Sequence, residues 1–63
     1  MKVGDRLYIT NRLYHVYSFF DDDNSEKIAM RTWSRHKQTW LYRVELVAVV
    51  EACLSDGTFR RAK

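Results

Sequence analysis

Apolar and polar side chains alternate along the start of the chain, as they do in a β-strand with one buried face. In residues 3–10 the inward positions are Leu7 and Ile9. Residues 12–20, RLYHVYSFF, are rich in aromatic and β-branched side chains, but they are apolar at both parities. We therefore expect the second strand to lie at the centre of a curled sheet or beside a partner.

The clearest alternation is in residues 26–33, EKIAMRTW. Ile28 and Met30 share one side of this predicted strand, and Trp33 lies on the other. The aliphatic side is expected to face the core, which leaves Trp33 as the best candidate for an exposed aromatic side chain.

A fourth strand is predicted over residues 39–44, TWLYRV. Either side of this strand could be the buried one, because each carries at least one large side chain. The even-numbered set has the larger apolar area and is expected to be buried: Trp40, Tyr42 and Val44. The odd-numbered side, which includes Arg43, is then expected to face outward.

Polar segments separate these strands. Asn11 with Arg12 suits a tight turn, because asparagine tolerates the left-handed conformation that short hairpins need. Residues 21–26, DDDNSE, are expected to form an exposed acidic loop, and SRHKQ, residues 34–38, a polar connection.

Residues 44–59, VELVAVVEACLSDGTF, fit either a helix or a strand followed by a hairpin turn. We prefer the helix, with Gly57 just past its end, because it gathers nearly all large apolar side chains on one stripe: Leu46, Val49, Val50, Cys53 and Leu54. TFRR, residues 58–61, is then a short closing strand with Phe59 directed inward.

These elements predict one small domain, residues 1–63, that is mainly β with one C-terminal helix. With four or five strands in so short a chain, the α+β fold is expected to be a strongly bent antiparallel sheet or a small, partly open barrel. Cys53 is the only cysteine, so an internal disulfide and a cysteine-based zinc cluster are excluded. It is interpreted as a small buried apolar residue in a reducing, cytoplasmic protein.

The opening VGDRLYITNRLYHVYSFF resembles the start of small Src-homology-3-like barrels of bacterial and phage proteins. In that family a glycine-aspartate pair, here Gly4 and Asp5, precedes the first strand, and a tyrosine-x-valine, here Tyr14 to Val16, lies in the next. The resemblance covers about the first twenty residues and implies a small barrel. The chain is also similar in size to phage accessory proteins that bind and inhibit host factors.

Enzymatic activity is not expected. His15, His36 and Cys53 are the only residues of their types, and no nucleophile elbow, phosphate-binding glycine loop or paired-acid motif occurs. A calcium loop at residues 21–32 is rejected, because Glu26 replaces the sharp-turn glycine and Thr32 replaces the closing glutamate. No cofactor, metal, secretory signal or membrane span is predicted.

Charge is distributed unevenly around the net value of +3. Residues 21–26 carry four acids, whereas RTWSRHKQTWLYR, residues 31–43, carries four formal positive charges plus a histidine, and the RRAK tail adds three. Two basic segments separated by an acidic one fit a surface that contacts an anionic partner, although a solvated charged face is the commoner explanation for any single run of charges. The candidate binding residues are Arg31, Trp33, Arg35, His36, Lys37, Arg43, Arg60 and Arg61, with Lys63 nearby.

Two functions fit these residues. The first is a protein–protein interaction module, of the accessory or inhibitor type, in which Trp33 and Arg35 anchor a host or phage protein or a second copy of the chain. The alternative is nucleic-acid binding, in which Arg31, Arg35 and Lys37 contact phosphates and Trp33 stacks on a base. The sequence places the first slightly ahead, because Trp40 and Tyr42 are assigned to the core.

Overall fold

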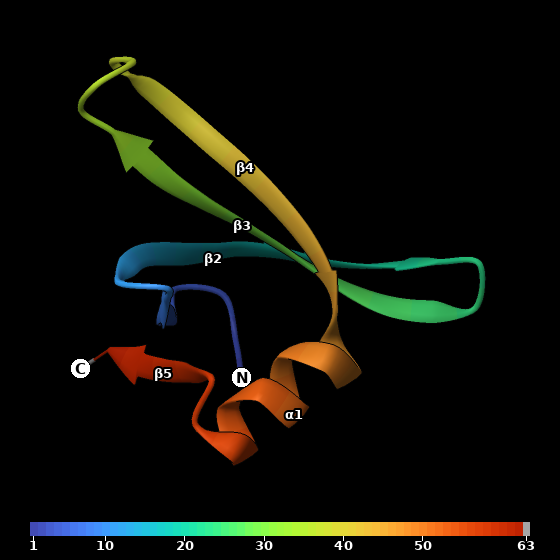
Figure 1. Cartoon of the computed structure of the whole chain (residues 1–63). Coiled ribbons are helices and arrows are strands. Elements are labelled where there is room, and N and C mark those ends of the chain that lie inside the picture. Colours follow the sequence, from blue (N-terminus) through green and yellow to red (C-terminus); the bar gives the residue numbers. More distant parts are fainter. Residues whose placement is uncertain (63) are drawn as a thin grey trace.

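The structure, a computed structural model, describes residues 1–62. This part of the chain contains five strands and one helix (Figure 1): β1 (Arg6–Ile9), β2 (Arg12–Asp22), β3 (Ser25–Ser34), β4 (Thr39–Leu46), α1 (Val47–Asp56) and β5 (Phe59–Ala62). The strands form one antiparallel sheet in the order β4-β3-β2-β1-β5. The predicted mainly β fold with a C-terminal helix is confirmed.

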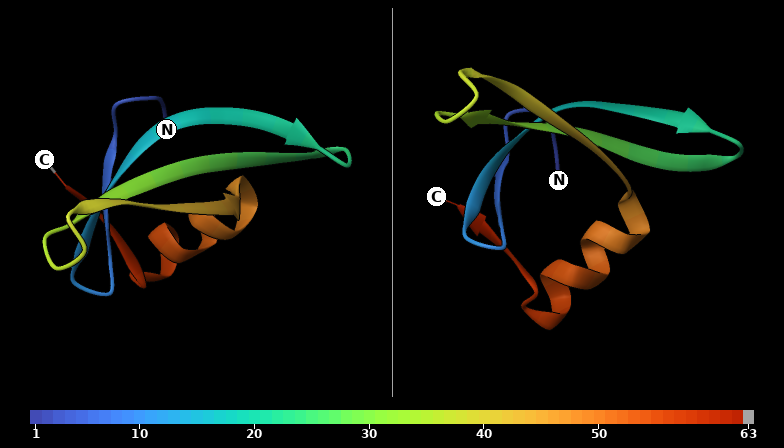
Figure 2. Two further views of the ribbon diagram at one scale, coloured as in Figure 1. Left: turned by 90° about the horizontal axis from the view of Figure 1, so that it is seen from above. Right: turned by 45° about the horizontal axis from the view of Figure 1, so that its top comes forward.

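The central strand β2 bends the sheet because it is shared between two halves. Its first residues pair with β1, and from His15 onward it pairs with β3. The β3–β4 hairpin therefore diverges from β1 and β5, and α1 lies beneath the sheet between β4 and β5 (Figure 2). The central position expected for the second strand is confirmed.

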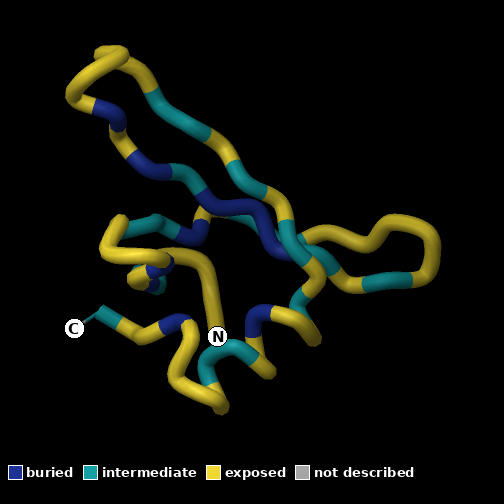
Figure 3. Tube along the Cα trace, viewed as in Figure 1, coloured by how far each residue is buried: buried dark blue, intermediate teal, exposed yellow. Residues whose placement is uncertain are grey.

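The core lies between the concave side of the sheet and the helix. Its buried apolar side chains come from four strands and α1: Leu7, Ile9, Val16, Ile28, Met30, Val50 and Phe59. In Figure 3 the buried stretches of β3, α1 and β5 surround this common interior, whereas the tips of the β2–β3 and β3–β4 hairpins are exposed. Leu7, Ile9, Ile28, Met30 and Phe59 lie inward as predicted.

A β-bulge explains the apolar side chains at both parities of β2. Pairing with β3 shifts between Val16 and Ser18, so Tyr17 is an extra residue with no partner in the register. Val16 points inward before the bulge, and Phe19 packs against the core after it. A bulge of one residue exchanges which alternate side chains point inward and which point outward. Even-numbered residues therefore face the core before the bulge, and odd-numbered residues face it afterwards.

The helix forms where it was predicted, but its buried stripe is shifted. Val47, Val50, Cys53 and Leu54 pack on the core, whereas Leu46 and Val49 are exposed. Leu46 is still part of β4, and the helix begins at Val47. Its core-facing residues Val47, Val50 and Leu54 recur at spacings of three and four. Cys53 is a free, half-buried cysteine.

The end of α1 is set by Gly57, which has φ 88° in the left-handed region where glycine pays no steric penalty. The Asp56 carboxylate accepts a 2.8 Å hydrogen bond from the Thr58 backbone N–H. Hydrogen bonding from Thr58 lowers the pKa of Asp56. The chain then enters β5.

Two strand connections are tight two-residue turns. Thr10 and Asn11 have φ values of 51° and 64°, and Asp23 and Asn24 have values of 51° and 62°. The first turn was predicted one residue later, at Asn11 and Arg12, but Arg12 is already the first residue of β2. The expected acidic loop over residues 21–26 is wrong, because β2 extends through Asp22 and β3 starts at Ser25. Aspartate and asparagine adopt the left-handed conformation of a short hairpin turn more readily than most residues. The acidic residues therefore lie at the tip of the β2–β3 hairpin.

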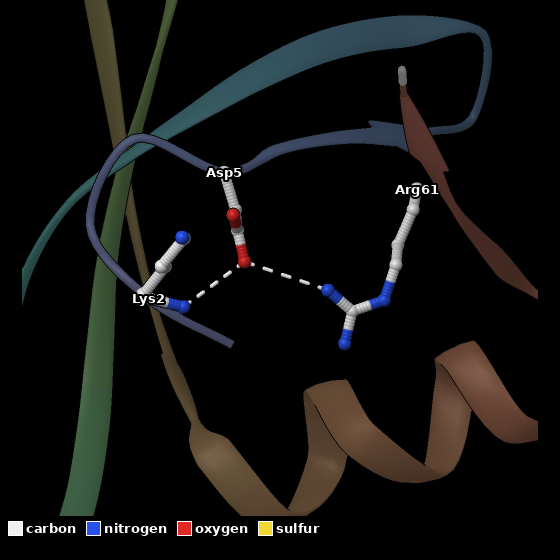
Figure 4. Close-up of polar contacts among 3 residues, drawn as sticks. All are labelled: Lys2, Asp5 and Arg61. Atoms are coloured by element: carbon white, nitrogen blue, oxygen red, sulfur yellow. Dashed lines mark hydrogen bonds and ion pairs between the residues drawn. The ribbon is translucent and has the colours of Figure 1, made fainter.

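Polar contacts join the start of the chain to its last strand (Figure 4). The Asp5 carboxylate accepts a 2.9 Å hydrogen bond from the Lys2 backbone N–H and a 3.4 Å contact from Arg61. The Asp5 carbonyl also accepts a 2.9 Å hydrogen bond from the Val16 N–H. Arg61 therefore helps to hold β5 against the N-terminal segment.

Candidate binding face

The side of β2, β3 and β4 that is turned away from the core, called the outer face below, carries both tryptophans. Trp40 pairs with Trp33, and Tyr42 pairs with Arg31, so all four side chains lie on this face. Tyr42 is 61% exposed and Val44 is 51% exposed. The prediction that Trp40, Tyr42 and Val44 are buried in the core is therefore wrong: Tyr42 and Val44 are exposed, and Trp40 is half-buried on the outer face.

The physical reason for this correction is the register of the β3–β4 hairpin. Ile28 and Met30 fix the inward side of β3, and pairing places Glu45 and Arg43 beside them. The outward side of β3 then dictates which side of β4 faces outward, whatever the apolar area of its side chains.

Aromatic rings on the outer face contact one another edge to face. The Trp33 and Trp40 ring centroids are 5.3 Å apart at an interplanar angle of 74°. His15 meets Trp40 at 6.3 Å and 90°. Tyr17, the bulge residue, meets Tyr42 at 5.8 Å and 81°. These are favoured geometries, so the rings hold one another in place.

Arg31 lies at the centre of these rings. Its guanidinium carbon is 4.4 Å from the Trp40 ring centroid and 5.6 Å from that of Tyr17. Stacking on aromatic faces stabilises the cation without using its N–H groups, whose edges remain geometrically suited to phosphate or carboxylate oxygens. The outer face therefore combines a held cation with exposed rings.

The outer side of the sheet is basic across its middle. His15 pairs with both Arg31 and Arg6, so a row of basic side chains crosses the outer side of β3, β2 and β1. Asp22, at the distal end of β2, is bound to Lys27 at 2.9 Å. By contrast, a depression of about 350 Å³ on the helix side contains two acidic side chains, Glu26 and Glu51. Its other lining residues are Met1, Phe19 and Val47.

An open groove, called the fork groove below, lies where β2 leaves β3 to pair with β1. It has a volume of about 460 Å³ and is lined by residues of the β1–β2 and β3–β4 hairpins: Asn11, Arg12, Leu13, His15, Thr32, Trp33 and Arg35. The Thr32 hydroxyl donates a 2.6 Å hydrogen bond to the Leu13 carbonyl, which joins the two sides. Two arginines and no acidic residue line this groove.

Five of the predicted binding residues lie together at one end of the molecule. Arg31 and Trp33 are on the outer face, and Arg35, His36 and Lys37 are exposed in the β3–β4 turn beside it. The Ser34 hydroxyl accepts a 3.2 Å hydrogen bond from the Lys37 backbone N–H, and Gln38 closes the turn with φ 56°. This turn therefore presents its cations at a defined place.

The three other predicted residues lie elsewhere. Arg43 is on the inward side of β4, where its Nε donates a 2.8 Å hydrogen bond to Glu45 that raises the pKa of the guanidinium. Arg61 contacts Asp5. Arg60 stacks over Tyr8, 5.7 Å from the ring centroid, on the β1–β5 part of the sheet. Lys63 lies outside the described residues.

Sequence reasoning missed four residues of the outer face and the fork groove: Asn11, Arg12, His15 and Tyr17. The sequence does contain a signal for the bulge at Tyr17, because apolar residues occupy both odd and even positions of β2. Arg12 and Arg35 are 23 positions apart in the chain, and only the bend of β2 brings both to one groove.

Within residues 1–62, no helix has the length and apolar character needed to cross a membrane. The same part of the chain holds no group of three or more histidine, cysteine, aspartate or glutamate side chains that could bind a metal ion. Comparison of the chain with protein-family models, with curated proteins and with solved structures found no match.

Proposed function

We propose that the protein is a non-enzymatic nucleic-acid-binding module that contacts its ligand through the outer face and the adjoining β3–β4 turn. One observation carries this proposal: exposed aromatic rings and cations share one face, while Glu26 and Glu51 lie on the other side of the molecule. This arrangement suits a ligand that combines flat apolar bases with a row of phosphates.

The two kinds of side chain have separate tasks in this proposal. Trp33 and Tyr42, 49% and 61% exposed, offer ring surface on which bases stack. Arg35 and Lys37 project from the turn into solvent, where they neutralise phosphates and release counterions. Arg31, held on Trp40, lies between these two groups.

The positions of Trp40 and Tyr42 reverse the order of the two functions considered from the sequence. If both were core residues, Trp33 alone could form an aromatic platform. Because they share a face with Trp33 and Arg31, the platform is larger and surrounds a cation. Base stacking then has several contact points, as single-strand binders require.

The first prediction concerns salt dependence. Arg35→Ala and Lys37→Ala are each expected to weaken binding to a random oligonucleotide pool and to reduce the slope of log K against log salt by about one unit. Fluorescence anisotropy across a salt series measures both quantities. Arg61→Ala is the matched control, because it removes the same charge from a side chain that contacts Asp5.

Absence of binding to random single- and double-stranded DNA and RNA at low salt would contradict the proposed function. An Arg61→Ala slope change as large as that of Arg35→Ala would show that only net charge matters. In that case the outer face would have no special role.

A second candidate function is protein–protein interaction, and a specific observation favours a second copy of the chain as the partner. Exposed apolar side chains continue along the outer face beyond the aromatic rings: Phe20, Val44 and Leu46. The acidic β2–β3 tip and the basic β3–β4 turn lie at opposite ends of β3. Two copies stacked face to face with antiparallel β3 strands would pair each acidic tip with a basic turn.

The second prediction tests this pairing. Arg35→Glu with Lys37→Glu, and separately Asp21→Lys with Asp23→Lys, should each give a monomer, whereas an equal mixture of the two proteins should restore the dimer. Sedimentation velocity at several concentrations measures these masses. A wild-type monomer at high concentration would exclude the second copy, and the accessory or inhibitor role toward another protein would remain a prediction.

A further inference from the structure

We infer that the fork groove is a one-nucleotide site that receives an unpaired base together with its phosphate, so that the preferred ligand is single-stranded. This inference rests on the proposed nucleic-acid-binding function and specifies its ligand. Its basis is the position of the groove, which adjoins the outer face at Trp33 and is lined by arginines from both hairpins.

The size of the groove suits a single small ligand. Its volume of about 460 Å³ falls within the range of about 300–1,000 Å³ that is usual for sites holding one small molecule. A nucleotide is a ligand of this kind.

The lining side chains supply the chemistry that a nucleotide needs. Arg12, at the start of β2, and Arg35, just after β3, both line the groove and are exposed, and we infer that their guanidinium groups bind the phosphate. The Trp33 ring borders the groove and is 49% exposed, which leaves surface for stacking. The Asn11 amide offers donors and an acceptor to the edge of a base.

The groove is also braced against collapse. The 2.6 Å hydrogen bond from Thr32 to the Leu13 carbonyl connects β3 to β2 at the place where these strands separate. The edge-to-face contact with Trp40 supports the Trp33 ring from the side of the outer face. Both walls are therefore held before a ligand arrives, which lowers the entropic cost of binding.

A base inside a duplex cannot use such a site. Its faces are covered by neighbouring bases and its edge by the complementary base, so it must first leave the stack. A single strand meets no such cost, and it can continue from the groove over Arg31 and Tyr42 on the outer face. The groove therefore favours single strands even though its cations attract any phosphate.

The test compares one fluorescent single strand of mixed sequence with its duplex in anisotropy titrations at the same salt concentration. Wild type is expected to bind the single strand about tenfold more tightly. Arg12→Ala should weaken single-strand binding about tenfold and remove this preference. Asn11→Gly, which keeps the left-handed turn that φ 64° requires, should weaken the single strand alone. Arg61→Ala should leave the preference unchanged.

A direct readout uses Trp40→Phe, in which Trp33 is the only tryptophan. Adenosine monophosphate should quench the Trp33 fluorescence of this variant, and Arg12→Ala in the same background should abolish the quenching. Circular dichroism must first show that Trp40→Phe retains the wild-type spectrum; otherwise the anisotropy comparison, which needs no Trp40 variant, decides the matter.

The outcomes separate the two proposals. Equal affinity for single strand and duplex, with Arg12→Ala weakening both equally, would overturn the one-nucleotide site and leave general nucleic-acid binding in place. Failure to bind either ligand would overturn the proposed function itself. A preference for single strands that survives both Arg12→Ala and Asn11→Gly would place the selective contact outside the fork groove.

Discussion

Ile28→Ala is expected to lower the free energy of unfolding by about 2–5 kcal/mol, because it removes a fully buried side chain and leaves a cavity. Ile28 has no exposed surface and belongs to the cluster formed by β1, β2, β3, α1 and β5. For a domain of 63 residues, a total stability of about 3–9 kcal/mol is typical. This one substitution should therefore remove a large part of the stability.

Urea unfolding followed by circular dichroism measures this loss. The matched control is Val44→Ala on the neighbouring strand, where the side chain is 51% exposed on the outer face. It is expected to change the stability by less than about 1 kcal/mol. Equal losses for the two variants would mean that the outer face is covered to the same degree as the core, as a stable dimer would require.

The strands and the helix of this fold could be predicted because their signals are local. Alternation at Leu7 and Ile9, and at Ile28 and Met30, is repeated often enough to fix both the strand and its inward side. Gly57 marks the end of α1 by a requirement of the backbone alone. These features need no knowledge of distant residues.

The orientation of β4 could not be predicted in the same way, because it depends on pairing. Trp40 and Tyr42 face outward since the register aligns them with Trp33 and Arg31, although their apolar area suggests burial. A 63-residue chain has few places to bury nine tryptophan, tyrosine and phenylalanine rings, and the rings at this end of the sheet pack on one another and on Arg31 instead. Hydrophobic area is therefore a weak guide to parity in a small domain.

The fork groove could not be predicted from the sequence, because it too depends on how distant segments pair. Its residues come from the β1–β2 turn with the start of β2, and from the end of β3 with the turn that follows, so the two arginines are far apart in the chain. The bulge at Tyr17 and the sharing of β2 between two neighbours bring these segments together. A bulge leaves only the weak trace of doubled apolar parity in the sequence.

Trp33→Ala is expected to lower the affinity for single-stranded nucleic acid by about tenfold to a hundredfold, because each base stacked on an aromatic ring contributes about 1–3 kcal/mol. Trp33 is half-exposed, so its loss should cost the fold about 1–2 kcal/mol, from its edge-to-face contact with Trp40 and the covered half of its ring. Anisotropy titrations and urea unfolding of the same protein measure the two quantities. Trp33→Phe, which keeps a smaller ring, should recover part of the affinity.

Trp40→Ala is the informative comparison, because the two tryptophans are cross-strand partners on one face. Trp40 is less exposed and contacts Trp33, His15 and Arg31, so its loss is expected to lower the stability by roughly 2–3 kcal/mol. Wild-type affinity in Trp33→Ala would exclude stacking on this ring. If the wild type is a dimer and Trp33→Ala loses both the dimer and the affinity for nucleic acid, Trp33 is assigned to self-association. Its ring would then be covered by a second copy of the chain rather than by a base.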